Sequence, residues 1–395
     1  MRIHTMDVLE TLREAFQKRY GAPPETVCFA PGRVNLIGEH TDYNGGHVFP
    51  CALSLGTWCA ARRRTDGTVR LATLNIPRSG VLRHPLGYRA KPGSRCWSRY
   101  PEGVVNAFRH AGFSIPTGMD LLFYGNIPSG SGLSSSASME VVTGAVLRAL
   151  YDLHVSRVRL AQLGQYAENV YVGVQCGIMD QFASAMGRRG HAIYLDTATL
   201  RFEYAPLHLS DCRIVVCNSR VKHSLASSEY NLRRSQCETA LAALRTVRED
   251  LPALGALTPE EFEAMSDAIP DPVCRKRARH AVYENARTKL ALEALRADRL
   301  EDFGRLMNES HVSLRDDYAV SCPELDLLTE LAWTTEGVVG SRMTGGGFGG
   351  CTVSIVKSRA LERFQTELGR VYRERTGLEP EFYVVEPGDG VRRLV

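Results

Sequence analysis

The chain has 395 residues, of which 44% are hydrophobic and 23% charged, and its formal net charge is +4. The length suits two domains of comparable size, and the composition is that of a globular protein, not a disordered, collagen-like or coiled-coil one. Its apolar runs are shorter than the ~18–20 residues that span a bilayer, and its net charge is small for a nucleic-acid-binding protein. We therefore expect neither a membrane nor a nucleic acid as partner.

The N-terminus and the cysteines bear on the cellular compartment. The opening MRIHTMDVLETLREAF predicts an amphipathic helix. It lacks the apolar core and cleavage site of a signal peptide, which predicts a cytoplasmic protein. The eleven cysteines include no CxxC pair, and Cys28, Cys51 and Cys351 lie in apolar segments. We therefore expect small buried side chains rather than disulfides or zinc ligands.

Strand-like and helix-like segments fill both halves of the chain. β-rich segments predict strands at residues 27–30, 48–61, 69–74, 119–124, 213–218, 337–343, 351–356 and 382–386. Apolar residues at a spacing of three to four predict helices at 138–153, 225–249, 272–297 and 300–317. The basic run 275–280 is expected to form a solvated helix face, with a nucleic-acid patch as the alternative.

The character of the sequence changes near Leu200. The chemistry-bearing motifs are concentrated before this point, so we expect one domain at 1–200 and a second at 201–395. The terminal strand is a candidate to return to the first domain.

A glycine- and serine-rich loop, GNIPSGSGLSSSA at 125–137, separates a predicted strand from a predicted helix. Gly130 and Gly132 allow the backbone to approach a ligand closely, and the N-terminus of the helix favours an anion. Ser134, Ser135 and Ser136 add hydroxyl groups, one of which could bind Mg²⁺. Because no lysine follows the second glycine, the loop is not a Walker motif. It predicts a phosphate site that takes its positive charge from an arginine or a metal; a flexible turn is the alternative.

A second polar cluster lies in APGRVNLIGEHTDYNGG at 30–46. Arg33, Glu39, His40 and Asp42 fall within ten residues, among glycines that bend the backbone. His40 and Asp42 have the spacing of metal ligands but lack a third one, and a set of hydrogen-bond partners for a polyol fits better. An ion-paired turn at the end of a strand is the alternative.

Asp180 lies in an apolar setting, in the segment GIMDQF at 177–182. A carboxylate there, next to an arginine, can stay ionised and act as a general base. The alternative is an N-cap of a helix, and spacing does not choose between the two.

These segments together resemble the galactokinases of the GHMP kinase family. The resemblance rests on 30–46, on PSGSGLSSSAS at 128–138 and on SRMTGGGFGGCTVS at 341–354, and 176–182, 223–234, 277–288 and 311–328 agree with it. It implies an α+β fold of two domains, each a mixed or antiparallel sheet packed with helices, with the active site in the cleft between them. It also implies ATP- and Mg²⁺-dependent phosphorylation of the C1 hydroxyl of α-D-galactose to galactose 1-phosphate, the first committed step of galactose catabolism, by a monomer or weak oligomer.

The resemblance gives roles to residues of each motif. Asp180 would be the base for the C1 hydroxyl, and Arg33 would keep this carboxylate ionised beside the transferring phosphoryl group. Galactose would contact Arg33, Glu39, His40, Asp42, Gly177, Asp180 and Tyr230. ATP would contact Trp97, Tyr100, Gly130, Ser131, Gly132, Leu133, Ser134, Ser135 and Ser136. Mg²⁺ would be held by Ser136 and Glu168. Trp97 and Tyr100 would line the adenine pocket; two ordinary core aromatics are the alternative.

Two other functions compete with this interpretation. A GHMP kinase for a related sugar, such as N-acetylgalactosamine, would tend to depart from EHTDYNGG, and this chain does not. A non-catalytic sensor that binds galactose and ATP can arise in this family by loss of a Ser-Ala pair in the loop. Here Ser136 and Ala137 are present, as are Arg33 and Asp180, which favours the enzyme.

Overall fold

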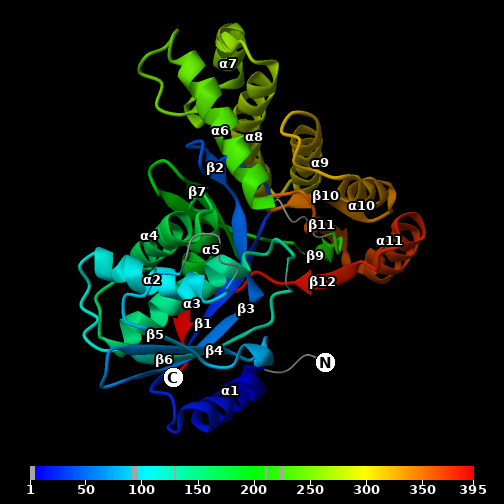
Figure 1. Cartoon of the computed structure of the whole chain (residues 1–395). Helices are drawn as coiled ribbons and strands as arrows, with labels where there is room; N and C mark the ends of the chain where they lie inside the picture. Colours follow the sequence, from blue (N-terminus) through cyan, green and yellow to red (C-terminus); the bar gives the residue numbers. More distant parts are fainter. Residues whose placement is uncertain (1–4, 91–95, 129, 210, 222–225) are drawn as a thin grey trace.

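A computed structural model describes residues 5–90, 96–128, 130–209, 211–221 and 226–395 (Figure 1). The helices are α1 (Thr5–Tyr20), α2 (Arg99–His110), α3 (Ser135–Leu150), α4 (Arg157–Ala167), α5 (Met179–Met186), α6 (Ala226–Leu244), α7 (Pro259–Met265), α8 (Pro272–Arg296), α9 (Leu300–Asp316), α10 (Pro323–Thr334) and α11 (Leu361–Thr376). A π-helical segment, η2 (Glu168–Val172), extends α4. In these described segments, no helix is both long and apolar enough to cross a membrane.

The strands form three sheets. They are β1 (Thr26–Asn35), β2 (His47–Val48), β3 (Pro50–Arg63), β4 (Thr68–Thr73), β5 (Leu82–Pro85), β6 (Met119–Gly125), β7 (His191–Asp196), β8 (Phe202–Pro206), β9 (Cys212–Asn218), β10 (Val338–Thr344), β11 (Cys351–Lys357), β12 (Glu381–Val385) and β13 (Arg392–Arg393). The largest sheet has the order β13-β1-β3-β6-β4-β5 and is mixed, since β4 and β6 run parallel. A second, antiparallel sheet has the order β10-β11-β9-β12, and a small third has β2-β7-β8.

Alternation of side chains along the strands decides which helices cover the first sheet. On β1, Val27 and Phe29 pack with Leu12 and Phe16 of α1, whereas Cys28 and the residues in step with it face the core shared with α2 to α5. Helix α1 therefore covers one face of the sheet, and α2 to α5 cover the other (Figure 1).

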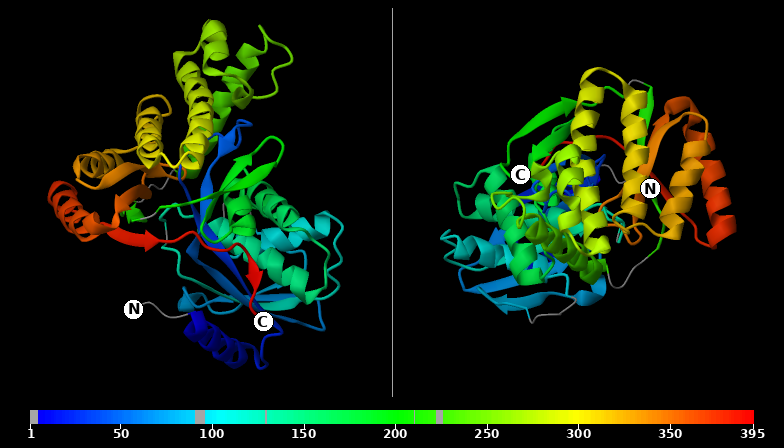
Figure 2. Two further views of the ribbon diagram at one scale, coloured as in Figure 1. Left: turned by 180° about the vertical axis from the view of Figure 1, so that it is seen from behind. Right: turned by 90° about the horizontal axis from the view of Figure 1, so that it is seen from above.

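The second sheet is covered in the same way. Ile214 and Val216 of β9 face a core shared with α8 and α9, and Val215 and Cys217 face α10 and α11. Helices α6 and α7 and the N-terminal half of α8 project away from both large sheets (Figure 2), whereas the C-terminal half of α8 packs in the core of the second sheet. This architecture is the two-domain α+β fold expected from the resemblance.

Each predicted strand and helix is present, with shifted ends. The helix predicted at 138–153 is α3, which begins at Ser135 because the N-cap is Ser134, and ends at Leu150 before the left-handed Asp152. The helix predicted at 225–249 is α6, which ends at Leu244; its predicted first residue lies outside the described residues. The strand predicted at 27–30 continues to Asn35 through an irregularity in register between Pro31 and Arg33.

The last predicted strand, 382–386, is β12, which pairs with β9 in the second sheet and does not return to the first. The short strand β13 beyond it was not predicted; it pairs with β1, so the end of the chain returns to the first sheet (Figure 2). The division at residue 200 stays a prediction.

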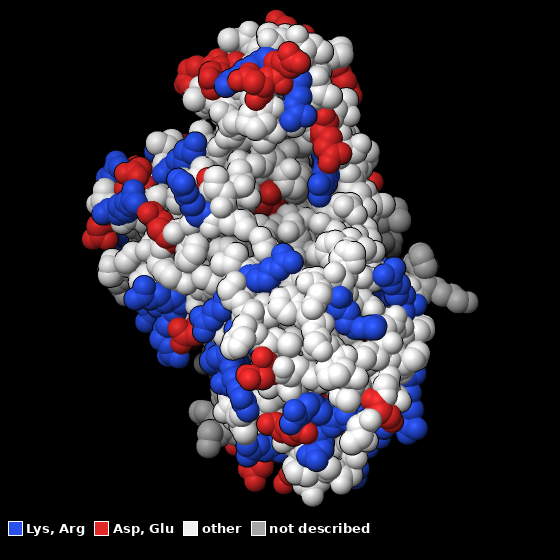
Figure 3. All heavy atoms as spheres, turned by 90° about the vertical axis from the view of Figure 1, so that its left-hand side faces the viewer, with Lys and Arg blue, Asp and Glu red and all other residues white. Residues whose placement is uncertain are grey.

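The basic run on α8 is not uniformly solvated. Arg275 forms an ion pair with Asp267 at 2.9 Å, and Arg277 is buried and donates to the carbonyl of Asp317. Figure 3 shows basic and acidic side chains interspersed on one face of the molecule.

A buried charge cluster connects the N-terminal motif to the second half of the chain. Arg342 of β10 is fully buried and pairs with the carboxylate of Glu39, and its other amino group lies 4.0 Å from Glu284 of α8. Burial alone would raise the pKa of Glu284, but Arg287, His280 and Arg342 overcome it and lower that pKa to about 2. These attractions hold the 38–44 turn against α8 and β10.

Replacement of Arg342 tests this connection. We expect Arg342→Met to lower the free energy of unfolding by about 3–5 kcal/mol, because it leaves buried carboxylates without their counter-charge. Urea unfolding measures the loss. The control is Arg296→Met, since Arg296 is half exposed and pairs with Glu203 at 2.7 Å on the surface; its cost should stay below about 1 kcal/mol. Equal losses in both variants would contradict a central role for Arg342.

Candidate active site

The three motifs meet at a cavity of about 240 Å³. The predicted site residues that line it are Arg33, Glu39, His40, Asp42, Gly130, Gly132, Ser134, Ser135, Ser136, Glu168, Gly177, Asp180 and Tyr230. Ser131 and Leu133 are buried within the loop, and Trp97 and Tyr100 line a different cavity. The chain thus brings together residues that lie almost two hundred positions apart.

Arg33 and Asp180 form a two-pronged ion pair at the centre of the cavity. Arg33 Nε donates to Asp180 Oδ1 and Nη2 donates to Oδ2, both at 2.8 Å. The irregularity of β1 just before Arg33 aims this side chain out of the sheet, where it is only 4% exposed. Asp180 lies in the first turn of α5, whose N-cap is Ile178. The alternative role of Asp180 as an N-cap is therefore wrong.

The glycine- and serine-rich loop at 125–137, here called the phosphate loop after the ligand predicted for it, is hydrogen-bonded to this ion pair. Arg33 Nη1 donates to the carbonyl of Gly132 at 2.6 Å, and the hydroxyl of Ser134 donates to Asp180 Oδ2 at 2.6 Å. Ser134 is the N-cap of α3 but makes no capping bond with its side chain. The first N–H groups of α3 and their positive dipole consequently stay available at the cavity for an anion. These two bonds attach Gly132 and Ser134 of the loop to the ion pair.

Asp42 and Gly177 form one wall of the cavity. Asp42 Oδ2 accepts a hydrogen bond from the backbone N–H of Met179 at 3.3 Å. Burial, and then the neighbouring charge of Asp180, raise the pKa of Asp42 to about 6. A Cβ on Gly177 would lie 2.0 Å from Asp42 Oδ2, so only glycine leaves this carboxylate in place.

His40 and Tyr230 also line the cavity, with ring centroids 5.4 Å apart. Burial, followed by the charge of His280, lowers the pKa of His40 to about 3, so its imidazole is neutral. Glu39 lines the cavity, but protein groups already occupy both of its oxygens. Arg342 and the Asn35 amide bind Oε2, and the N–H of Gly345 donates to Oε1 at 3.0 Å.

Two buried carboxylates lie next to Asp180. The side-chain amide of Gln181 donates to Glu168 Oε2 at 2.7 Å and to Glu140 Oε2 at 2.9 Å. Burial, and then the charge of Asp180, raise the pKa of Glu168 to about 7, and the Ser136 hydroxyl acts in the opposite direction. Burial and Glu168 raise the pKa of Glu140. Such crowding of negative charge is favourable for a cation.

We compared this donor set with the needs of Mg²⁺. In the described part of the chain, no group of three or more His, Cys, Asp or Glu side chains could hold a metal. Magnesium, however, is often held by one or two protein oxygens together with phosphates and water. Ser136 and Glu168 supply such oxygens at the cavity, and the buried Oε1 atoms of Glu140 and Gln181 have no partner among the described residues. These residues fit the ion.

Trp97 and Tyr100 line a second cavity of about 490 Å³, whose wall also contains Ser135 and Ser136. The two cavities therefore meet at the N-terminus of α3. The buried indole Nε1 of Trp97 has no hydrogen-bond partner within the described segments. An unpaired donor at this position is consistent with a ligand-binding role. Trp97 also packs edge-on against Phe123 at 5.7 Å, so it contributes to the core as well.

Sequence reasoning missed several residues of the cavity. Gly345 and Gly346 line it, although the segment that carries them was recognised as a motif. Cys176 and Met179 line it too, and their position beside Gly177 and Asp180 was the available signal. Arg342 gave no signal of its own, since an arginine on a strand is usually expected at the surface.

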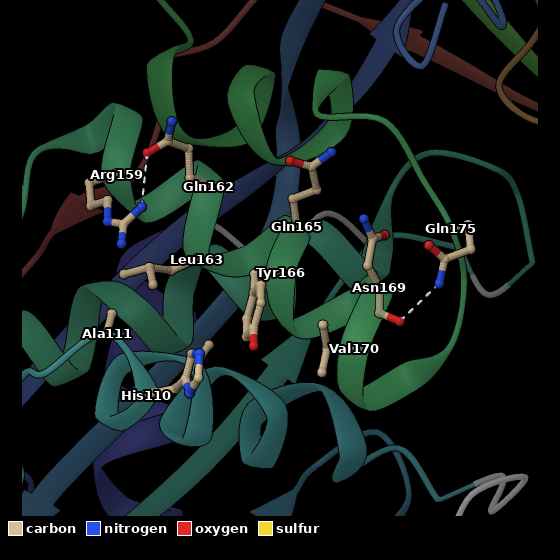
Figure 4. Close-up of a pocket in the computed structure, with 11 residues that line it drawn as sticks. His110, Ala111, Arg159, Gln162, Leu163, Gln165, Tyr166, Asn169, Val170 and Gln175 are labelled. Carbon is tan, nitrogen blue, oxygen red and sulfur yellow. Dashed lines mark hydrogen bonds between the residues drawn. The ribbon is translucent and has the colours of Figure 1, made fainter.

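Cavity size alone does not identify the site. A cavity of about 720 Å³ lies between α2, α4 and η2, where His110 and Tyr166 stack at 5.4 Å (Figure 4). It contains none of the predicted site residues. Gln165, on its rim, donates to the carbonyl of Cys176 at 3.3 Å and thereby supports the wall of the smaller cavity. Converging polar groups distinguish the smaller one.

Gly177 provides a test of the wall that it forms with Asp42, which the resemblance predicts to contact the sugar. We expect Gly177→Ala to raise the KM for the sugar about tenfold or more, because the added methyl group displaces the Asp42 carboxylate. Steady-state kinetics measure this, and circular dichroism checks the fold. Gly67→Ala is the control, since a Cβ there meets nothing within 4 Å in the described structure. Unchanged sugar binding in Gly177→Ala would contradict this account of the wall.

Comparisons with known proteins agree with this geometry. Residues 14–63 match the galactokinase galactose-binding signature, 99–188 the N-terminal domain of GHMP kinases and 291–374 their C-terminal domain. The galactokinase of Clostridium beijerinckii is 50% identical over 98% of this chain and 100% of its own length. That of Bacillus subtilis is 48% identical over 93% and 94%.

Solved structures give the same result. The Lactococcus lactis galactokinase complexed with galactose superposes with a TM-score of 0.95 at 46% identity, over 98% of this chain and 100% of that one. The mevalonate kinase of Methanococcus jannaschii shares the fold, with a TM-score of 0.65 at 17% identity, over 92% and 98%. The signature, the full-length identity and the superposition together place this chain in the galactokinases of the GHMP kinase family.

Proposed function

We propose that the chain transfers the γ-phosphoryl group of ATP to the C1 hydroxyl of α-D-galactose and forms galactose 1-phosphate. The observation that carries this proposal is the Arg33–Asp180 pair at the junction of a phosphate loop and a polar cavity. Phosphoryl transfer needs in-line placement of the two reactants and neutralisation of spread negative charge. The relatives are galactokinases, and one solved relative is complexed with galactose.

Asp180 is the residue that receives the proton of the C1 hydroxyl. Its carboxylate accepts hydrogen bonds from two nitrogens of Arg33 and from the Ser134 hydroxyl. These bonds fix the orientation of the carboxylate in the cavity. Proton transfer to an Asp180 oxygen accompanies phosphoryl transfer, as the hydroxyl oxygen forms its bond to phosphorus. Placement of the hydroxyl contributes as much as abstraction of its proton.

Arg33 serves both the base and the phosphate. Its Nη1 donates a hydrogen bond to the Gly132 carbonyl, which holds the guanidinium beside the phosphate loop. The N–H groups at the start of α3 and the hydroxyls of Ser135 and Ser136 complete the phosphate site. Ser136 and Glu168 would hold Mg²⁺, which when bound supplies positive charge for the phosphate oxygens.

We assign the nucleotide base and the sugar to two different cavities. Trp97 and Tyr100 line the cavity that we assign to adenine. His40, Asp42, Gly177 and Tyr230 line the cavity that we assign to galactose. Glu39 supports the sugar cavity through Arg342 and Gly345, and its direct contact with galactose stays a prediction. The cytoplasmic location, the monomeric or weakly oligomeric state and the lack of nucleic-acid or membrane partners also stay predictions.

The function is tested first by turnover. Purified protein with Mg²⁺, ATP and galactose should form ADP and galactose 1-phosphate in equal amounts. A protein that binds both ligands and forms no ADP would be a sensor and not an enzyme.

Asp180→Ala tests the role of the base. We expect turnover to fall by about 10²–10⁴-fold, the usual contribution of a general base, while ATP binding measured by calorimetry changes little. Asp180→Asn is the matched variant, because it keeps the shape and the Ser134 contact but cannot take the proton. If either variant retains turnover within tenfold of the parent, Asp180 is not the base.

Asp42→Ala separates sugar binding from nucleotide binding. The Asp42 carboxylate lies in the wall shared with Gly177 and away from the Trp97 cavity, so its loss should raise the KM for galactose far more than the KM for ATP. Steady-state kinetics with each substrate varied in turn measure the two values. Equal increases would contradict a sugar contact.

The pKa of Asp42 predicts a pH dependence. An ordinary aspartate takes up its proton near pH 4, whereas burial and Asp180 raise the pKa of Asp42 to about 6. Below pH 6 the protonated form predominates and loses an acceptor for a sugar hydroxyl. We therefore expect kcat/KM for galactose to fall as the pH drops through about 6. In Asp42→Asn this descending limb should be absent; its persistence would assign the limb to another group.

A further inference from the structure

A chain of hydrogen bonds leads from the helical projection to the imidazole of His40. The hydroxyl of Tyr43 lies 2.7 Å from His40 Nδ1. The hydroxyl of Tyr318 lies 2.7 Å from that of Tyr43, and Cys237 Sγ lies 3.2 Å from the Tyr318 hydroxyl. Tyr318 and Cys237 are buried, and the chain contains no charged group. None of these three residues contributes to the chemistry described above.

The far end of this chain favours one of its two directions. The side-chain amide nitrogen of Asn44 lies 3.7 Å from Cys237 Sγ and donates to the carbonyl of His40 at 2.7 Å. An amide nitrogen only donates, so the thiol accepts from Asn44, and Tyr318 is the group left to accept the thiol hydrogen. In this direction Tyr318 donates to Tyr43, and Tyr43 donates to His40 Nδ1. The opposite direction would leave the thiol hydrogen without an acceptor among the described residues.

His40 can respond to this direction because its ring is neutral. Burial lowers the pKa of His40 to about 3, and a neutral imidazole carries one hydrogen on one of its two nitrogens. In the direction given above, Nδ1 accepts from Tyr43 and the hydrogen lies on Nε2. Within the described structure, the buried Nε2 has no hydrogen-bond partner, and His40 lines the cavity. The ring of Tyr318, 4.8 Å from that of His40, holds it in this orientation.

We propose that Asn44, Cys237, Tyr318 and Tyr43 fix His40 as its Nε2–H tautomer, so that His40 donates a hydrogen bond to a hydroxyl oxygen of the sugar. Tyr43 and Tyr318 are positioning residues, since they act on the sugar only through His40. The identity of the acceptor as galactose rests on the proposed function, but the tautomer is a property of the free protein. A ligand whose group at this point only donates, such as an ammonium group, is therefore rejected.

The tautomer is measured directly in the full-length protein labelled with ¹⁵N-histidine. Long-range ¹H–¹⁵N spectra distinguish a protonated ring nitrogen from an unprotonated one, and the His40 signals are assigned by their loss in His40→Asn. We expect Nε2 protonated and Nδ1 unprotonated in the parent without any ligand. Tyr43→Phe removes the donor to Nδ1 and should give a mixture of the two tautomers. An Nδ1–H tautomer in the parent, or unchanged His40 signals in Tyr43→Phe, would overturn the proposal.

Variants at the buried end separate the chain from simple packing. Cys237→Ser keeps one donor and one acceptor and should keep the parent His40 signals, whereas Cys237→Ala interrupts the chain and should shift them. The control is Tyr283→Phe, which removes a hydroxyl bonded to Glu263 on the surface and should change nothing at His40. Thermal unfolding checks that all variants are folded. Equal His40 signals in the Ser and Ala variants would also overturn the proposal.

Kinetics connect the tautomer to the sugar. Loss of one positioned hydrogen bond should raise the KM for galactose about three- to tenfold in Tyr43→Phe, with kcat and the KM for ATP almost unchanged. An unchanged KM for galactose would remove His40 as a donor to the sugar. If the parent shows the expected tautomer but does not phosphorylate galactose, the proposed function fails and the chain of donors stands. If it phosphorylates galactose with the opposite tautomer, the proposal fails and the function stands.

Discussion

The pairing of Arg33 with Asp180 is the interaction on which the site depends. It joins three separate parts of the fold, because Arg33 lies on β1 just after an irregularity in register, Asp180 lies in the first turn of α5, and the phosphate loop is bonded to both residues. An arginine buried to this degree needs a full set of acceptors, and Asp180 and the Gly132 carbonyl supply them. A shift of the phosphate loop would therefore also move the Asp180 carboxylate, because Arg33 and Ser134 bond the two together.

A second buried arginine, Arg342, fixes the turn of the first motif, as Arg33 fixes the phosphate loop. Arg342 binds Glu39 and faces Glu284, and Glu284 in turn accepts from the N–H of Gly38 at 2.9 Å. The turn that presents His40 and Asp42 is thus fixed by charges on β10 and α8, in the other half of the chain. Among the polar residues of the first motif, Glu39 therefore has both oxygens bound by protein groups, whereas His40 and Asp42 are presented to the cavity.

The sequence predicted the elements and the motif residues better than their pairings. The strand–loop–helix order around Gly130 and Gly132 follows from local patterns, and only the ends of α3 were shifted. The link from Arg33 to Asp180 spans 147 positions, and no local rule specifies it; the family resemblance supplied it. Arg342 was not predicted, because burial of a charged side chain is decided by partners from distant segments.

The balance of charge in the cavity explains why ATP and a metal would complete it. Among the described residues that line the cavity, Arg33 is the only arginine or lysine, against the carboxylates of Glu39, Asp42, Glu168 and Asp180. The charge of Asp180 contributes to the raised pKa of both Asp42 and Glu168. The ionised Asp180 therefore makes the neighbouring carboxylates Asp42 and Glu168 harder to ionise. A divalent cation beside Glu168 would reverse this effect, so binding of the metal nucleotide would favour the ionised state of Asp42, in the wall that we propose for the sugar.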